Sequence, residues 1–220
     1  MAEQGNVGDI TQQAQPDVRI CFVGDSFVAG VGDEEHLGWA GRLAAHAHRR
    51  GSALTSYNLG IRRDTSADIL RRIQAECAAR LPAGCHAGIV LSFGVNDTML
   101  EAGSCRVRAE DSVSHLRELL VRLGRQGWPV LVAGPPAVAD PAHNERIAAL
   151  DALLEAECSR HAVPYASVVH QMQGHETWRR EVREGDGAHP GAGGYDALAA
   201  LLQPAWDRWL AAVRAGSTGL

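Results

Sequence analysis

Residues 21–30 read CFVGDSFVAG, an apolar run that changes abruptly into small and polar residues. The run Val18–Val23 has the length and composition of a buried strand, and Gly24, Asp25 and Ser26 follow it directly. A serine in this position either caps the helix that follows or acts as a nucleophile at the edge of a sheet. The remainder of the sequence has to decide between these two roles.

The alternation of short apolar runs with stretches of helical period predicts an α/β fold. Five β-α units call for a parallel sheet covered by helices on both faces, which is a single three-layer α/β/α domain. The expected strand order is 2-1-3-4-5, as in flavodoxin-like sheets. Pro204 lies inside the last helical stretch and should kink or split it. The four strands expected after the first are Leu54–Asn58, Ile89–Phe93, Val130–Ala133 and Val163–Val169.

Composition narrows the class of protein. The chain has 220 residues and a formal net charge of −5, which disfavours nucleic acid as a partner because phosphate binding needs a basic surface. The polar residues 1–17 are expected to form a disordered leader before a domain at residues 18–214. No apolar run is long enough to span a membrane. Five scattered cysteines without a secretory signal indicate reduced thiols and a cytoplasmic protein.

Polar and small residues follow every predicted strand. In an open parallel sheet, ligands bind beyond the carboxyl ends of the strands, so these residues should gather at one edge. The set contains a serine, a glycine, an asparagine and an aspartate-histidine pair, which together can build a serine hydrolase site. It consists of Gly24-Asp25-Ser26, Asn58-Leu59-Gly60, Gly94-Val95-Asn96-Asp97, Gly134-Pro135-Pro136 and Asp186-Gly187-Ala188-His189-Pro190.

Four of these blocks resemble, in order and with plausible spacing, the motifs of the GDSL or SGNH hydrolases. The blocks are Gly24-Asp25-Ser26, Gly60, Gly94-Val95-Asn96-Asp97 and Asp186-Gly187-Ala188-His189-Pro190, and they span nearly the whole chain after the leader. The resemblance implies the three-layer fold and hydrolysis of carboxylic esters or thioesters without a cofactor. One block alone would say little, whereas four in order are specific.

The chemistry of the triad can also be argued from the residues themselves. Serine is a poor nucleophile and needs a base, which His189 can supply through one ring nitrogen. Asp186, three residues earlier, can hold the other ring N–H and stabilise the imidazolium. These side chains favour a nucleophilic Ser26 over a helix cap. Ser26, Asp186 and His189 are therefore the predicted catalytic residues.

An ester hydrolase also needs donors for the oxyanion of its transition state. Ser26 opens a helix, so its backbone N–H is unpaired at the positive end of the helix dipole. Gly60 allows close approach of a bare backbone, and Asn96 carries a side-chain amide. The resemblance implies that these three positions form the oxyanion hole.

Three further residues are candidates for substrate binding. They are Arg62, Arg63 and Pro135. An arginine that lines the pocket would favour an acidic or polar substrate, whereas an arginine that pairs with Asp64 would be a plain surface contact, and we favour the surface contact. His46 and His48 lie two apart on a helix and face different ways, so no metal site is expected.

The predicted function is cleavage of a small-molecule ester of small or medium acyl length. A thioesterase or an acyltransferase would use the same triad, and the sequence does not separate them. A flavodoxin-like binding module without catalytic activity is a remote alternative. The absence of lysine disfavours a phospho-acceptor receiver, and the loop after the first strand has too few donors for a flavin phosphate.

Overall fold

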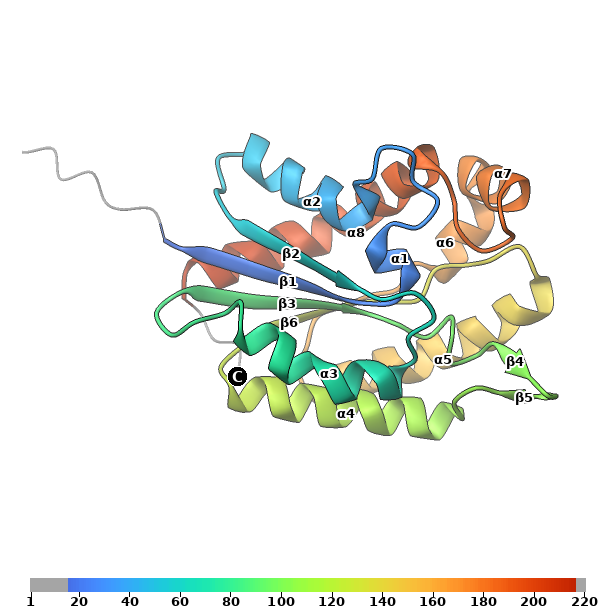
Figure 1. Ribbon diagram of the computed structural model, residues 1–220, viewed down its shortest axis with the longest axis horizontal. Helices are drawn as coiled ribbons and strands as arrows, with labels where there is room; N and C mark the ends of the chain where they lie inside the picture. The colour runs from blue at the N-terminus through green and yellow to red at the C-terminus, as the bar shows by residue number, and fades with distance from the viewer. Residues whose placement is uncertain (1–15, 217–220) are drawn as a thin grey trace, which may run out of the picture.

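The computed structural model describes residues 16–216. Its centre is a five-stranded parallel sheet in the order β2-β1-β3-β6-β7 (Figure 1), which confirms the expected order 2-1-3-4-5. The strands are β1 (Val18–Gly24), β2 (Thr55–Gly60), β3 (His86–Ser92), β6 (Val130–Ala133) and β7 (Tyr165–Ala166). A small antiparallel hairpin, β4 (Leu100–Glu101) and β5 (Ser104–Cys105), lies outside the sheet.

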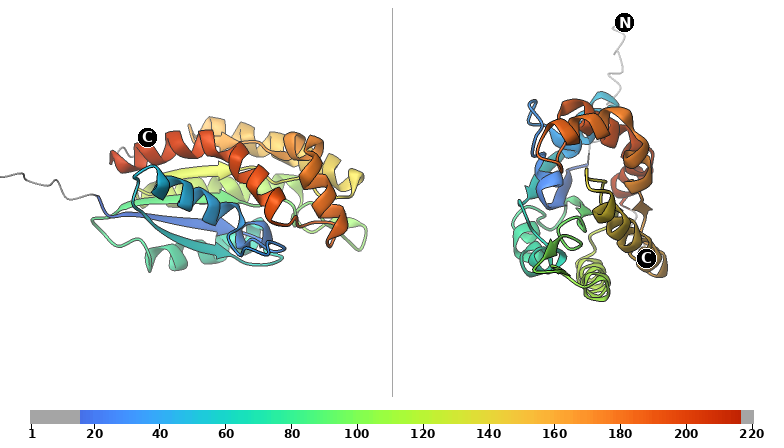
Figure 2. Two further views of the ribbon diagram at one scale, coloured as in Figure 1. Left: turned by 90° about the horizontal axis from the view of Figure 1, so that it is seen from above. Right: turned by 90° about the vertical axis from the view of Figure 1, so that its right-hand side faces the viewer.

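Helices cover both faces of the sheet, so the three-layer α/β/α architecture is confirmed (Figure 2). One layer contains α2 (Gly38–Arg49), α6 (Val169–Gly174), α7 (Glu176–Glu184) and α8 (Ala192–Arg214), and the short α1 (Ser26–Ala29) follows β1. The other layer contains α3 (Ser66–Ala78), α4 (Ala109–Arg125) and α5 (Pro141–Arg160).

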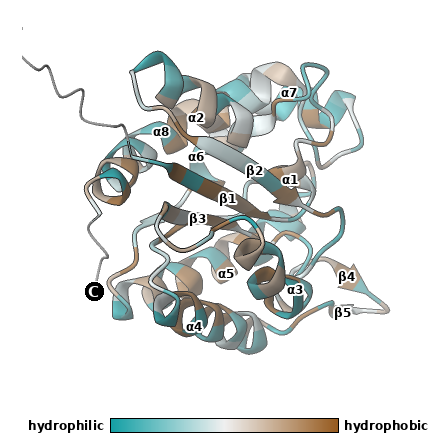
Figure 3. Ribbon diagram, turned by 60° about the vertical axis from the view of Figure 1, so that its left-hand side comes forward, coloured by the Kyte–Doolittle hydropathy of each residue, from teal (hydrophilic) through white to brown (hydrophobic). Residues whose placement is uncertain are grey.

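Strand β1 lies in the middle of two hydrophobic cores. Because successive side chains of a strand point to opposite faces, Ile20 and Phe22 pack with α2 and α8, and Cys21 and Val23 pack with α3 and α4. All four are at most 1% exposed, and Figure 3 shows the strand as a hydrophobic band. A strand buried on both faces explains the continuous apolar run that precedes Ser26.

One strand is shorter than expected, and the last helix is not split. The apolar run Val163–Val169 forms only the two-residue strand β7, because Val169 already begins α6 and packs into the helical layer. Helix α8 runs from Ala192 to Arg214 without a split at Pro204. The buried side chains along it, including Trp206 and Trp209, hold it against the sheet.

The predicted leader at residues 1–17 falls outside the described residues except for Pro16 and Asp17. The carbonyl of Asp17 accepts a 2.8 Å hydrogen bond from the His86 N–H, so the chain meets the sheet one residue before β1. Within residues 16–216, none of the helices combines the length and the apolarity needed to cross a membrane.

Candidate active site

Ser26 is the first residue of α1, immediately beyond the end of β1. The turn that places it is tight: a Cβ on Gly24 would lie 2.1 Å from the Ser92 carbonyl oxygen, so only glycine fits between the strands. Asp25 caps the helix, since its Oδ1 accepts from the Phe27 N–H at 2.9 Å. As the first N–H of α1, the Ser26 N–H has no partner inside the helix.

Ser26, His189 and Asp186 form a continuous hydrogen-bonded chain. His189 Nε2 lies 2.7 Å from Ser26 Oγ, and His189 Nδ1 lies 2.8 Å from Asp186 Oδ2. The carboxylate only accepts, so Nδ1 carries the ring proton and Nε2 is left to accept from the serine hydroxyl. The geometry therefore suits transfer of the serine proton to the imidazole.

The segment from Asp186 to His189 organises itself. Asp186 Oδ1 accepts from the backbone N–H groups of Ala188 at 3.0 Å and His189 at 2.9 Å, while Oδ2 faces the imidazole. Partial burial alone would raise the pKa of Asp186, but the His189 N–H, the His189 ring and the Ala188 N–H outweigh it and lower that pKa to about 2. Asp186 is therefore ionised throughout the neutral range.

Asp25 has the opposite electrostatic character. Its burial raises the pKa of the carboxyl to about 7, against the opposing hydrogen bond from the Phe27 N–H and with support from the nearby Asp97 carboxylate. Its Oδ2 accepts from Asn96 Nδ2 at 3.2 Å. Asp97 has a structural role, because it accepts from Ser66 N at 2.8 Å and from Ser112 Oγ at 2.7 Å.

The three predicted oxyanion donors are not equally placed. Asn96 lines the same cavity as Ser26, and its amide nitrogen also lies 3.1 Å from the Asp64 carbonyl oxygen. Gly60 does not line this cavity, and its N–H donates to Asn58 Oδ1 at 3.0 Å. A Cβ at Gly60 would lie 2.2 Å from the Ala29 nitrogen, so this glycine allows close packing against α1.

The cavity at the serine has a volume of about 180 Å³. It lies between the loop after β3, the start of α5 and the segment before α8. Because it holds Ser26, Asn96 and His189 together, a carbonyl group bound there can meet a nucleophile, a base and an amide donor. Its walls are Ser26, Phe27, Val95, Asn96, Met99, Val138, Asp140, His143, Asp186, Gly187, Ala188 and His189.

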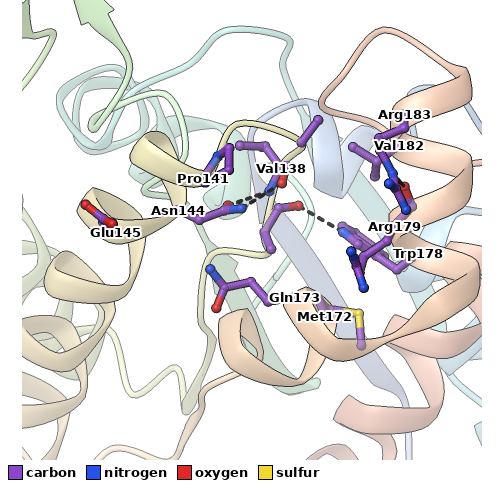
Figure 4. A pocket seen from close by; sticks show the side chains of 12 residues that line it. Val138, Pro141, Asn144, Glu145, Met172, Gln173, Trp178, Arg179, Val182 and Arg183 are labelled. Carbon is purple, nitrogen blue, oxygen red and sulfur yellow. Dashed lines mark hydrogen bonds between the residues drawn. The ribbon is translucent and has the colours of Figure 1, made fainter.

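A larger groove of about 620 Å³ adjoins this cavity (Figure 4). Val138 lines both, and the Ala139 N–H donates to the Gly187 carbonyl at 2.9 Å, which ties the groove to the histidine segment. Trp178 lies along the groove, with its indole N–H bonded to the Ala137 carbonyl at 2.9 Å. The groove has the position to hold the part of a substrate that extends away from Ser26.

The three candidates for substrate binding lie elsewhere. Arg63 is exposed, has a left-handed φ of 68°, and pairs with Glu101 of the hairpin at 2.9 Å. Arg62 is also exposed, and the partner of Asp64 is Arg72, at 2.7 Å. Pro135 is buried, close to Gly94. None of the three lines the serine cavity or the adjoining groove.

Two titratable wall residues, His143 and Asp140, were not among the candidates from the sequence. Asp140 caps α5, and His143 occupies the first turn of that helix. Its position near the carboxyl end of β6, at the same edge as Ser26, was the available signal. Over residues 16–216, no three histidine, cysteine or acidic side chains are grouped as a metal site would need.

Residues 22–197 match the model of the GDSL-like Lipase/Acylhydrolase family. A comparison with curated protein sequences gave no match.

Solved structures show the same fold. The lipase/acylhydrolase from Enterococcus faecalis has 23% sequence identity and a TM-score of 0.67, over 86% of this chain and 96% of that one. The psychrotrophic esterase EstA from Pseudoalteromonas sp. has 15% identity and a TM-score of 0.68, over 88% and 98%. The acetylxylan esterase Axe2 from Geobacillus stearothermophilus has 13% identity and a TM-score of 0.67, over 86% and 93%.

Proposed function

The chain belongs to the GDSL-like Lipase/Acylhydrolase family, and from that premise we propose that it hydrolyses carboxylic esters of a small or medium acyl group with Ser26 as the nucleophile. The family places it among enzymes rather than among flavodoxin-like binding modules. The observation that carries the proposal is the chain of contacts from Ser26 Oγ through His189 to Asp186, at 2.7 and 2.8 Å.

In the first half of the reaction, Ser26 Oγ attacks the ester carbonyl while its proton moves to His189 Nε2. Ionised Asp186 stabilises the imidazolium that results. The new oxyanion accepts from the Ser26 N–H and from Asn96 Nδ2, and Asn96 has to turn away from Asp25 or from the Asp64 carbonyl to donate. For Gly60 the same role rests on the resemblance alone, because its N–H donates to Asn58 Oδ1.

When the tetrahedral intermediate collapses, the bond to the alcohol breaks and His189 returns its proton to the departing alkoxide. An acyl group is then bound to Ser26 as an ester. A water molecule attacks this acyl-enzyme with His189 as base, and the acid leaves with the serine hydroxyl restored. The small cavity at Ser26 supports a short acyl group, with longer substrates continuing into the groove.

The cellular location and the choice of acyl acceptor are predictions, as are the site residues. All five cysteines are free thiols, which agrees with the predicted cytoplasmic location. Ester hydrolysis, thioester hydrolysis and acyl transfer differ in the leaving atom and in the acceptor, and the triad serves each of them. Rates with oxygen esters and thioesters of equal acyl length, with and without an added alcohol, separate the three.

The decisive test is Ser26→Ala. Ser26 is 5% exposed and alanine is smaller, so the fold should persist while kcat for 4-nitrophenyl acetate falls by roughly 10⁴–10⁶. Ser104→Ala, in the exposed position of β5, is the matched control and should behave as wild type. A serine-directed organophosphorus reagent should add to Ser26 in the wild-type protein. Activity of Ser26→Ala within tenfold of wild type would overturn the proposal.

A further inference from the structure

His143 lies in the wall of the serine cavity but has no role in the proposed reaction. It is half-buried in the first turn of α5 and shares the cavity with Ser26 and Asn96. A histidine beside a nucleophile, but outside the hydrogen-bonded chain that activates it, can act on the substrate. Which of its ring nitrogens is available decides what it can recognise.

The contacts of His143 fix its tautomer. Nε2 lies 3.1 Å from the Val95 carbonyl oxygen and 3.0 Å from Thr98 Oγ1. The carbonyl can only accept, and the Thr98 hydroxyl donates its own proton to the Gly94 carbonyl at 2.9 Å. Both neighbours of Nε2 therefore accept from it, so Nε2 carries the proton and Nδ1 carries a lone pair.

The ring is also held neutral. Burial lowers the pKa of His143, against the opposing hydrogen bond to the Val95 carbonyl, and the nearby Arg146 guanidinium lowers it further. In the neutral ring, Nδ1 is an acceptor. Within residues 16–216 Nδ1 has no hydrogen-bond partner. It is nevertheless accessible, because the buried polar side-chain atoms without a partner are Trp206 Nε1, Trp209 Nε1 and Arg214 Nε.

We propose that Nδ1 of His143 accepts a hydrogen bond from a hydroxyl group of the substrate, which makes His143 a specificity-determining residue for hydroxylated esters. This inference rests on the proposed function. The hydroxyl has to lie close to the ester carbonyl, because the cavity that holds His143 and Ser26 has only about 180 Å³. It can belong to the alcohol half or to the acyl half of the ester.

The alternative is that His143 only braces the loop after β3, which carries Asn96. Two substitutions separate the roles. In His143→Gln the amide nitrogen can replace Nε2 and keep the bond to the Val95 carbonyl, but no acceptor remains in the place of Nδ1. In His143→Asn the amide oxygen can replace Nδ1 as acceptor, while the bond to the Val95 carbonyl is lost.

The experiment measures kcat/KM for two pairs of esters that differ by one hydroxyl in place of a methyl group. 2-Hydroxyethyl acetate and propyl acetate test the alcohol half, and ethyl glycolate and ethyl propionate test the acyl half. The wild type should prefer the hydroxylated member of one pair by roughly three- to tenfold, as one neutral hydrogen bond provides. His143→Gln should abolish this preference and His143→Asn should retain most of it.

The matched control is His48→Gln, at an exposed position of α2, which should keep the wild-type ratio. An equal ratio in the wild type and in His143→Gln, or a wild type with no preference in either pair, overturns the inference. A fall in rate for all four esters in both variants, without a change in ratio, also overturns it. That outcome is expected if His143 only stabilises the loop after β3. The proposed function fails separately, if Ser26→Ala still hydrolyses these esters.

Discussion

The carboxyl groups of Asp25 and Asp186 lie next to the proposed nucleophile and base in the sequence, and their surroundings differ. Asp25 precedes Ser26 and is 1% exposed, whereas the side chain of Asp186, three residues before His189, is 52% exposed. Asp25 accepts from one backbone N–H and one amide, and Asp186 accepts from two backbone N–H groups and a ring N–H. Burial raises the pKa of Asp25 to about 7, while the donors around Asp186 lower its pKa to about 2.

The difference teaches that the balance of burial and hydrogen-bond donors decides where negative charge is kept in this site. Asp186 is surrounded by N–H groups and stays charged, so it suits an imidazolium partner. Asp25 is buried among other carboxylates and takes up a proton near neutral pH, which makes it a weaker acceptor for Asn96. Each of the following predictions tests one side of this contrast.

The largest effect is expected for Asp186→Asn. Its amide oxygen would stay on the N–H groups of Ala188 and His189, so the NH₂ group would face His189 Nδ1. The ring proton would then move to Nε2, where it prevents acceptance of the serine proton, and kcat should fall by roughly 10³–10⁴. Steady-state kinetics with 4-nitrophenyl acetate measure this. A loss of less than tenfold would show that Asp186 does not set the tautomer.

Asn96→Ala should have the next largest effect. Removal of one oxyanion donor should lower kcat by roughly 10²–10³, with little change in KM, because the donor acts in the transition state. The same kinetics measure both constants. A change confined to KM would instead make Asn96 a ground-state binding residue, and its contact with Asp25 would then have no catalytic meaning.

Asp25→Asn should change how stability depends on pH. The raised pKa of Asp25 means that its favourable contribution is complete below the unfolded value of about 3.9 and is lost as pH rises through about 7. Asparagine does not titrate, so the stability of Asp25→Asn relative to wild type should increase by about 2–3 kcal/mol from pH 5 to pH 8. Urea unfolding at the two pH values measures this.

Asp186→Asn is the control for that measurement. The folded pKa of Asp186 is about 2, and with an unfolded value of about 3.9 it loses its stabilising effect only as pH falls below this window. The titration of the Asp186 carboxyl itself should therefore add no slope from pH 5 to pH 8. Equal slopes for the two variants would contradict the contrast between the two carboxyl groups.

The smallest effect is expected for Arg62→Gln and Arg63→Gln. Both side chains are exposed, and the pair of Arg63 with Glu101 is open to solvent, where such pairs contribute little. The ratio of rates for 4-nitrophenyl hemisuccinate and 4-nitrophenyl butyrate should stay within about twofold of wild type, because screening by water and salt weakens the charge at the cavity. A selective fall in the rate with the anionic ester would show that these arginines contribute to substrate binding.

Much of the architecture could be predicted because the signals are local. The apolar run before Ser26 marks a strand buried on both faces, and the motif blocks after the strands meet because parallel strands share one edge. The start of helix α6 was missed because the β-branched residues of Val163–Val169 favour a strand, while tertiary packing places Val169 in a helix.

The finer electrostatics were not predictable, because they depend on contacts between distant segments. The pKa of Asp25 reflects burial by residues from several elements, and the tautomer of His143 depends on the Val95 carbonyl, 48 residues away in the chain. For Gly60 the sequence correctly indicated that a side chain would not fit, but the group that comes close in the structure is the backbone of α1.

The Asp186 carboxylate makes its three hydrogen bonds within four residues, and this has a consequence for how the base is held. The segment from Asp186 to His189 is tied to its surroundings by the contact of His189 with Ser26, by the Gly187 N–H bond to the Val182 carbonyl, by the Ala139–Gly187 bond and by packing of the His189 ring on Phe27. The base, His189, and the carboxylate of Asp186 are thus held in one short segment. A displacement of this segment would therefore move the base and the carboxylate away from Ser26 together.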